Sequence, residues 1–387
     1  MKPNIGRIVS ILVACVMLGA PVLAGGVVAR KTPTPPPEPT GTLEVTSLTE
    51  IVHGGGQYVR LYDWDSTNEQ FEHTWSGTLD SNYDGFVAIG DLDGDGVKEI
   101  VASGTQKSGT RKQPVWTYYM KVWWAGDASD SPTLNLDVGS SYMDICDIDG
   151  DGTNELLSLS GGLRVWEVTK TGYVEEAHLS LGTGAHYGLA EADADNDGAL
   201  EILVGFTGDD SIGVVIEYDP TDGYSVSKEI RPDDRNGPID DLSVGDVDGD
   251  GKNEVFGTGY MDGNIYLWRY DSSSGEYEQI WTTQGSEDIE SSNDVSDVDG
   301  DGICEFMHTK LYDGTLVLYK YDTSKQTFYN VGSYSGTYGG NADSMLSHDW
   351  DGDGKAELID PYNVWEWDGS KMTVIQTLAP ASMAAIG

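Results

Sequence analysis

The chain has 387 residues, of which 65 are acidic and 22 are basic, and its formal net charge is −43. This balance argues against nucleic acid or an anionic membrane surface as a partner, because both attract basic patches. With only three cysteines, a disulfide framework cannot be the main source of stability.

Residues 1–24 have the features of a secretory signal. Lys2 and Arg7 accompany a run of apolar residues, and small residues follow at Ala24. Cleavage is the first interpretation. The alternatives are lipidation at Cys15, which ends a sequence resembling a lipoprotein cleavage box, and retention of the apolar run as a short membrane anchor. All three place the rest of the chain outside the cytoplasm, secreted or at the cell surface.

A linker follows over residues 25–41. Its segment KTPTPPPEPT is too rich in proline for a helix or a central strand and is typical of an extended spacer. The folded part is therefore expected over residues 42–387.

The folded part is organised around an acidic loop that occurs in six copies, the first of them GDLDGDGVKEIV. Aspartates stand at loop positions 1, 3 and 5, glycine at position 6 and glutamate at position 9. The first aspartates are 56, 46, 53, 51 and 52 residues apart, which indicates an internal repeat. The acidic residues are Asp91, Asp93, Asp95 and Glu99; Asp147, Asp149, Asp151 and Glu155; Asp193, Asp195, Asp197 and Glu201; Asp246, Asp248, Asp250 and Glu254; Asp297, Asp299, Asp301 and Glu305; and Asp349, Asp351, Asp353 and Glu357.

Carboxylates at this spacing repel one another, and a hard cation removes the repulsion. Calcium fits best, because it takes six to eight oxygens and accepts a backbone carbonyl at position 7, where the side chain is free to vary; magnesium prefers stricter geometry. The residues at position 7 are Val97, Thr153, Ala199, Lys252, Ile303 and Lys355. The sequence therefore predicts about six calcium ions, and solvated acidic turns are the alternative. A helix-loop-helix site requires its glutamate at position 12 and flanking helices, whereas here the glutamate is at position 9 and the flanks are rich in β-branched residues.

Each loop is expected at the tip of a β-hairpin, and a second hairpin with an aromatic first arm follows it. Four strands in about 50 residues is the length of a β-propeller blade. Residues at matching register are expected to fill the space between blades: Tyr62, Trp124, Trp166, Ile216, Trp268, Tyr319 and Trp365.

The sequence contains seven aromatic hairpins but six acidic loops. The N-terminal hairpin lacks a preceding strand, and the C-terminal SMAAIG matches the strand GFVAIG. We therefore predict an all-β, seven-bladed propeller in which the C-terminal strand completes the N-terminal blade and removes the free sheet edges. The alternative is that the sequence stops partway through a repeat. Cys146 and Cys304 fall in repeats that are not neighbours, so free thiols are expected.

The motif DxDxDGxxE between short strands, repeated along residues 42–387, resembles the FG-GAP/VCBS repeat family, which includes the head propellers of integrin α chains. The resemblance implies a seven-bladed propeller with calcium between the first and second strands of a blade, and it carries the ligand roles onto the aspartates and glutamates given above. Glutamate at position 9, where the family often has aspartate, and the lack of a Gly-Ala-Pro triplet are departures.

For function, the residues favour a binding module over an enzyme. The six histidines share no metal-ligand spacing, no catalytic residue set is visible, and the loop carboxylates are expected to be taken up by metal. In the resembled fold the ligand face lies opposite the calcium loops. The candidates there are Lys107, Arg111, Lys112 and Trp116, then His186 and Tyr187, then Arg231 and Arg235. We expect a monomeric propeller that binds an extracellular protein or glycan. The alternatives are a scaffold subunit of the cell surface and a polysaccharide- or lipid-active enzyme.

Overall fold

The computed structural model describes residues 43, 50–55, 57–79, 86–125, 134–136, 140, 142–159, 161–181, 185–207, 212–233, 239–259, 263–283, 289–310, 315–336, 345–360, 362–378 and 383–386. The predicted signal and the proline-rich linker lie outside these residues. The chain divides into the units Met1–Pro37 and Glu38–Gly387, and all described residues belong to the second unit. None of them forms a helix with the length and hydropathy of a membrane span.

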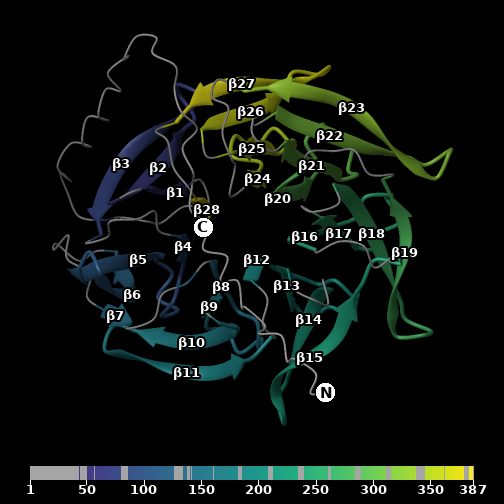
Figure 1. Cartoon of the computed structure of the whole chain (residues 1–387). Helices are drawn as coiled ribbons and strands as arrows, with labels where there is room; N and C mark the ends of the chain where they lie inside the picture. The colour runs from purple at the N-terminus through teal and green to yellow at the C-terminus, as the bar shows by residue number, and fades with distance from the viewer. Residues whose placement is uncertain are drawn as a thin grey trace, which may run out of the picture. The chain divides into compact units, whose positions relative to one another are not determined.

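The described residues form seven sheets, each of four antiparallel strands, which we call blades 1 to 7 (Figure 1). Blade 1 contains β28 (Met383–Ile386), β1 (Glu50–Gly55), β2 (Tyr58–Asp65) and β3 (Gln70–Thr78). Blade 2 contains β4 (Val87–Gly90), β5 (Glu99–Thr110), β6 (Gln113–Trp123) and β7 (Leu134–Leu136). Blade 3 contains β8 (Met143–Cys146), β9 (Glu155–Leu159), β10 (Leu163–Thr169) and β11 (Gly172–Leu179).

Blade 4 contains β12 (Ala185–Ala192), β13 (Glu201–Thr207), β14 (Ile212–Asp219) and β15 (Gly223–Ile230). Blade 5 contains β16 (Asp241–Gly245), β17 (Glu254–Gly259), β18 (Asn264–Asp271) and β19 (Glu276–Thr282). Blade 6 contains β20 (Ile289–Ser296), β21 (Glu305–Lys310), β22 (Thr315–Asp322) and β23 (Thr327–Ser335). Blade 7 contains β24 (Leu346–His348), β25 (Glu357–Ile359), β26 (Asn363–Trp367) and β27 (Met372–Thr377).

The blades form a closed ring. The first strands of successive blades contact one another in the order β28, β4, β8, β12, β16, β20 and β24, and β24 contacts β28 again. Figure 1 shows these strands nearest the centre and the fourth strands at the rim. The predicted seven-bladed propeller is therefore confirmed.

Blade 1 is assembled from both ends of the folded unit, as predicted. β28 pairs with β1 in antiparallel register, from Ile51 opposite Ile386 to Gly54 opposite Met383. This pairing satisfies the backbone groups of β1 that would otherwise form a free sheet edge.

The core consists of seven hydrophobic clusters, and each cluster lies between two neighbouring blades. Because side chains alternate between the two faces of a strand, adjacent residues serve different clusters. In β1, Ile51 packs between blades 1 and 7, whereas Val52 packs between blades 1 and 2. The residues expected to fill these gaps are all buried, but one assignment is off by one residue. Trp123, rather than Trp124, lies opposite Ile100, as Trp166 lies opposite Leu156. Two consecutive tryptophans made this register ambiguous in the sequence.

Cys146 and Cys304 are free thiols in blades 3 and 6, as expected. The formation of the blades therefore does not depend on a bond between them.

Candidate functional site

Each acidic loop connects the first and second strands of blades 2 to 7. In blade 2, Asp91 follows β4 and Glu99 is the first residue of β5. The second strand runs from this loop to the turn before the third strand. The acidic loops and the turns between second and third strands therefore lie at opposite ends of the blades.

The six loops share one set of internal hydrogen bonds. The backbone N–H of position 6 donates to the first aspartate at 2.7–3.1 Å. The N–H of position 7 donates to the third aspartate at 2.8–3.1 Å. The N–H of position 2 donates to Oε2 of the glutamate at 2.8–3.3 Å. These bonds hold the carboxylates of the loop in place, and in five loops the second oxygen of the first aspartate accepts a further backbone N–H.

The backbone of the loop explains the glycine at position 6, where φ lies between 82° and 96° in all six loops. Position 4 is also left-handed, a feature that the sequence analysis did not single out. It is glycine in five loops and Asn196 in the third, with φ of 65°. The Asn196 side chain also accepts a hydrogen bond from the N–H of Asn253 at 2.6 Å, which joins the loops of blades 4 and 5.

Carboxylate oxygens of each loop also converge. Six groups of at least three acidic side chains, with ligand atoms within 4.8 Å of one another, occur in the described residues. Those of blades 2 to 6 comprise loop positions 1, 3 and 9. Several converging atoms are buried and have no hydrogen-bond partner, among them Asp93 Oδ1, Glu99 Oε1 and Asp147 Oδ1. An all-oxygen set with buried oxygens that have no hydrogen-bond partner fits a hard cation such as calcium.

The electrostatics of the loops also favour a cation. Burial, with a smaller effect from Asp93, Asp95 and Asp91, raises the pKa of Glu99 to about 8. Burial and the neighbouring aspartates likewise raise the pKa of Glu357 to about 8. The ionised form of these glutamates is thus costly unless a positive charge lies beside them.

Three of the loops have a basic side chain from outside the loop against their acidic groups. Lys170 Nζ lies 2.9 Å from Asp93 and 3.0 Å from Asp95. Arg269 contacts the acidic group of blade 5 and Lys320 that of blade 6. The sequence analysis did not identify these three side chains, which come from the third strand or the turn after it.

The predicted ligand residues of blade 2 lie on a long hairpin, which we call the β5–β6 arm (residues 105–118). β5 has 12 residues and β6 has 11, whereas the second strands of the other blades have 3 to 7. Residues 106–118 are all exposed. Lys107 lies opposite Trp116, with Nζ 4.6 Å from the ring centroid. Tyr118 shares this face of the arm, because it stands two residues after Trp116, and Arg111 and Lys112 form the turn.

The other residues predicted to bind an external ligand lie in blade 4 or after it, and no contact between them and the β5–β6 arm is found among the described residues. His186 and Tyr187 belong to β12, and their side chains are outside what the structure describes. Arg231 is exposed after β15 and forms an ion pair of 2.7 Å with Glu229. Arg235 lies outside the described residues.

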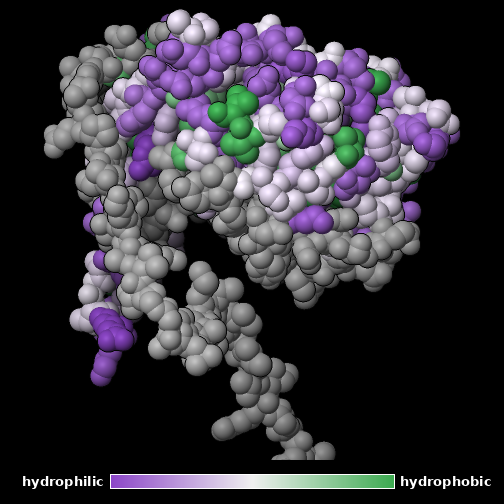
Figure 2. All heavy atoms as spheres, turned by 90° about the horizontal axis from the view of Figure 1, so that it is seen from above, coloured by the Kyte–Doolittle hydropathy of each residue, from purple (hydrophilic) through white to green (hydrophobic). Residues whose placement is uncertain are grey.

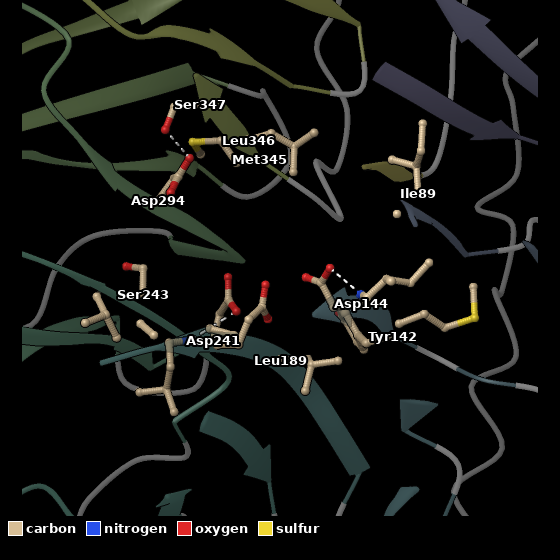
Figure 3. A pocket seen from close by; sticks show the side chains of 18 of the residues that line it. Ile89, Tyr142, Asp144, Leu189, Asp241, Ser243, Asp294, Met345, Leu346 and Ser347 are labelled. Carbon is tan, nitrogen blue, oxygen red and sulfur yellow. Dashed lines mark hydrogen bonds between the residues drawn. The ribbon is translucent and has the colours of Figure 1, made fainter. Parts of the chain in front are cut away.

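A cavity of about 600 Å³ occupies the centre of the ring and is lined by the first strands of blades 2 to 7. Figure 3 shows the carboxyl groups of Asp144, Asp241 and Asp294 in this cavity, with Asp294 accepting a hydrogen bond of 2.6 Å from Ser347. Burial raises the pKa of Asp294 to about 7. On the outer surface that Figure 2 presents, the side chains are also mainly hydrophilic.

Together, the ring of four-stranded sheets and the repeated acidic groups define a β-propeller with potential metal sites in its loops. The model described as "FG-GAP-like repeat" matches residues 121–204 and 246–308, and confirms the predicted resemblance in those two regions. None of the curated proteins compared matches the chain.

Solved structures with the same fold are distant in sequence. A Lactobacillus plantarum protein is 12% identical with a TM-score of 0.59, covering 87% of this chain and 98% of its own. A periplasmic gluconolactonase of Pseudomonas aeruginosa is 12% identical with a TM-score of 0.53, covering 86% of this chain and 96% of its own. The BP39L lectin of Burkholderia pseudomallei is 11% identical with a TM-score of 0.56, covering 87% of this chain and 100% of its own. At such identities the similarity concerns the fold alone.

Proposed function

We propose that this protein is an extracellular, calcium-stabilised binding module that uses the β5–β6 arm to recognise an acidic ligand. Calcium is assigned to the acidic loops, through the aspartates, the ninth-position glutamate and the carbonyl at position 7. The signal-like N-terminus supports a place outside the cytoplasm, where millimolar calcium would saturate such loops.

The exposed β5–β6 arm is the observation that carries the proposal. Trp116 and Tyr118 are 38% and 55% exposed, which is unusual for large aromatic side chains on a strongly charged protein. No ion pair joins Lys107, Arg111 or Lys112 to an acidic group in the part of the chain that the structure describes. Cations beside aromatic rings suit a ligand that offers carboxylates on an apolar frame, such as an acidic glycan or a protein segment. The lectin among the similar folds is compatible with a glycan but does not select one.

Binding of the full chain to immobilised hyaluronan, a carboxylate-bearing polysaccharide, tests the proposal in millimolar calcium, with neutral dextran as the reference. We expect binding to hyaluronan that weakens at least tenfold when Lys107, Arg111 and Lys112 are replaced by Ser, and when Trp116 is replaced by Ala. The matched control replaces Lys228, Lys325 and Lys371, which lie outside the arm, with Ser. Equal binding by the arm variants and the control would reject the arm as the site.

A further inference from the structure

One position of the third strand faces the metal-ligand glutamate in each of blades 2 to 7. In blade 3 the register places Leu156 opposite Trp166, and in blade 5 it places Val255 opposite Trp268. The residue before Leu156 or Val255 is the loop glutamate, and the residue after the tryptophan is what we call the facing position. Continuing the register by one residue places the facing position opposite the glutamate, and directly opposed residues of antiparallel strands project to the same side.

The facing position differs in charge among the blades. By the same register, it is glutamate in blades 3, 4 and 7, basic in blades 5 and 6, and tryptophan in blade 2. The residues, from blade 2 to blade 7, are Trp124, Glu167, Glu217, Arg269, Lys320 and Glu366. Three loops thus have a fifth acidic residue at the facing position, and two have a basic one there.

The two basic residues contact side chains of the acidic groups themselves. The Arg269 guanidinium lies 2.5 Å from Asp248 Oδ2 and 2.7 Å from Glu254 Oε1. The Lys320 ammonium lies 2.6 Å from Asp299 Oδ2 and, as an ion pair without hydrogen-bond alignment, 2.9 Å from Glu305 Oε1. Both therefore contact positions 3 and 9 of their loops.

The basic side chains that contact the loops of blades 2 and 7 do not contact the glutamate at position 9. Lys170 reaches positions 3 and 5 of the blade 2 loop, but its side chain is 49% exposed and Oε1 of Glu99 stays unpartnered. In blade 7, Lys355 contacts only Asp353, at position 5 of its own loop. Either lysine can turn outward without breaking a contact to the buried glutamate at position 9.

We propose that the facing position decides which loops take a divalent cation: the loops of blades 2, 3, 4 and 7 bind calcium, and in blades 5 and 6 the side chains of Arg269 and Lys320 take the place of the ion. This proposal rests on the proposed binding of calcium to the loops. A calcium ion must displace a cation that is held by two ligand residues in blade 5 and by three in blade 6, whereas in blades 3, 4 and 7 the extra glutamate adds to the attraction. We expect the affinities of the two classes to differ by about a hundredfold or more.

Counting bound calcium by native mass spectrometry on the full chain, after equilibration at micromolar free calcium, tests the proposal. The wild type should carry four ions. Arg269→Glu and Lys320→Glu should each add one, since either change gives the loop the arrangement of blade 4. Glu217→Arg should remove one. Lys228→Glu, which changes the charge equally on the outer strand β15, should leave the count at four.

The outcomes separate this proposal from the proposed calcium function. Six ions in the wild type, or a count that neither Arg269→Glu nor Lys320→Glu changes, would overturn the division into two classes while leaving calcium binding intact. A protein that binds no calcium, even at millimolar concentration, would overturn both. Because two variants are expected to gain an ion, a folding defect in Glu217→Arg alone does not decide the result.

Discussion

Two connections of blade 2 lie at opposite ends of β5 and differ in almost every respect. The acidic loop before β5 recurs in six blades, and its backbone N–H groups donate to its own carboxylates. The β5–β6 arm beyond it occurs once and extends into solvent. A feature repeated in most units of a ring is expected to stabilise each unit that has it, whereas a feature present once can be altered without disturbing the other units. We therefore expect the acidic loops to stabilise the fold and the β5–β6 arm to bind the ligand.

Removing calcium should have the largest effect. Each saturated site stabilises the folded state by about 2.7 kcal/mol when free calcium is a hundred times its dissociation constant. Over several sites, EGTA should lower the Tm by more than about 10 °C relative to millimolar calcium. Differential scanning calorimetry measures this shift. An unchanged Tm would show that the loops do not stabilise the fold through a metal.

Disabling one acidic loop should abolish one calcium site. Asp195→Asn keeps the side-chain volume at position 3 of the blade 4 loop but removes its charge, and should reduce the calcium-dependent stability by about 2–3 kcal/mol. Denaturant unfolding with calcium and with EGTA measures the difference. Asp222→Asn, in the exposed turn between β14 and β15, is the matched control. If Asp195→Asn lowered the free energy of unfolding equally in calcium and in EGTA, Asp195 would stabilise the fold without binding calcium.

The central cavity offers a test of stability that does not involve the loops. The pKa of Asp294 is raised by burial to about 7, against 3.8 for an ordinary aspartate, so the folded state favours the protonated form. The stability that this group contributes is complete below about pH 4 and is lost as the pH rises toward 7. Asp294→Asn should therefore stabilise the protein by about 1–2 kcal/mol at pH 8 and have little effect at pH 4.

Unfolding of Asp294→Asn and wild type across this range, in constant millimolar calcium, measures the change. The calcium concentration is fixed because loop occupancy also depends on pH. A stability difference that is the same at pH 4 and pH 8 would show that Asp294 ionises normally.

The β5–β6 arm should give the smallest effect on stability. Replacing Lys107, Arg111 and Lys112 with Ser should change the free energy of unfolding by no more than about 0.5 kcal/mol, because these side chains are exposed and make no ion pair among the described residues. Chemical denaturation measures this quantity. If the free energy of unfolding fell by more than about 2 kcal/mol, the arm would also stabilise the fold, contrary to the division of roles between the loops and the arm.

Much of the fold could be predicted because its signals are local. The spacing of Asp91, Asp93 and Asp95, repeated along the chain, predicted the loops, and the β-branched residues that flank the loops predicted the strands. The likeness of SMAAIG to GFVAIG predicted that β28 would complete blade 1. Trp124 was assigned in place of Trp123 because composition does not fix the register of two adjacent aromatic residues.

The amino-acid sequence by itself determined the repeat, the number of blades and the carboxylates that converge in each loop, since a motif of nine residues specifies its own turn and its own hydrogen bonds. Only the tertiary structure decided what stands beside those carboxylates. Arg269 lies 15 residues after Glu254 in the sequence, yet its guanidinium lies 2.7 Å from that glutamate. The pairing of strands brings them together, and Asp144 and Asp294 come to share the central cavity only through the closure of the ring.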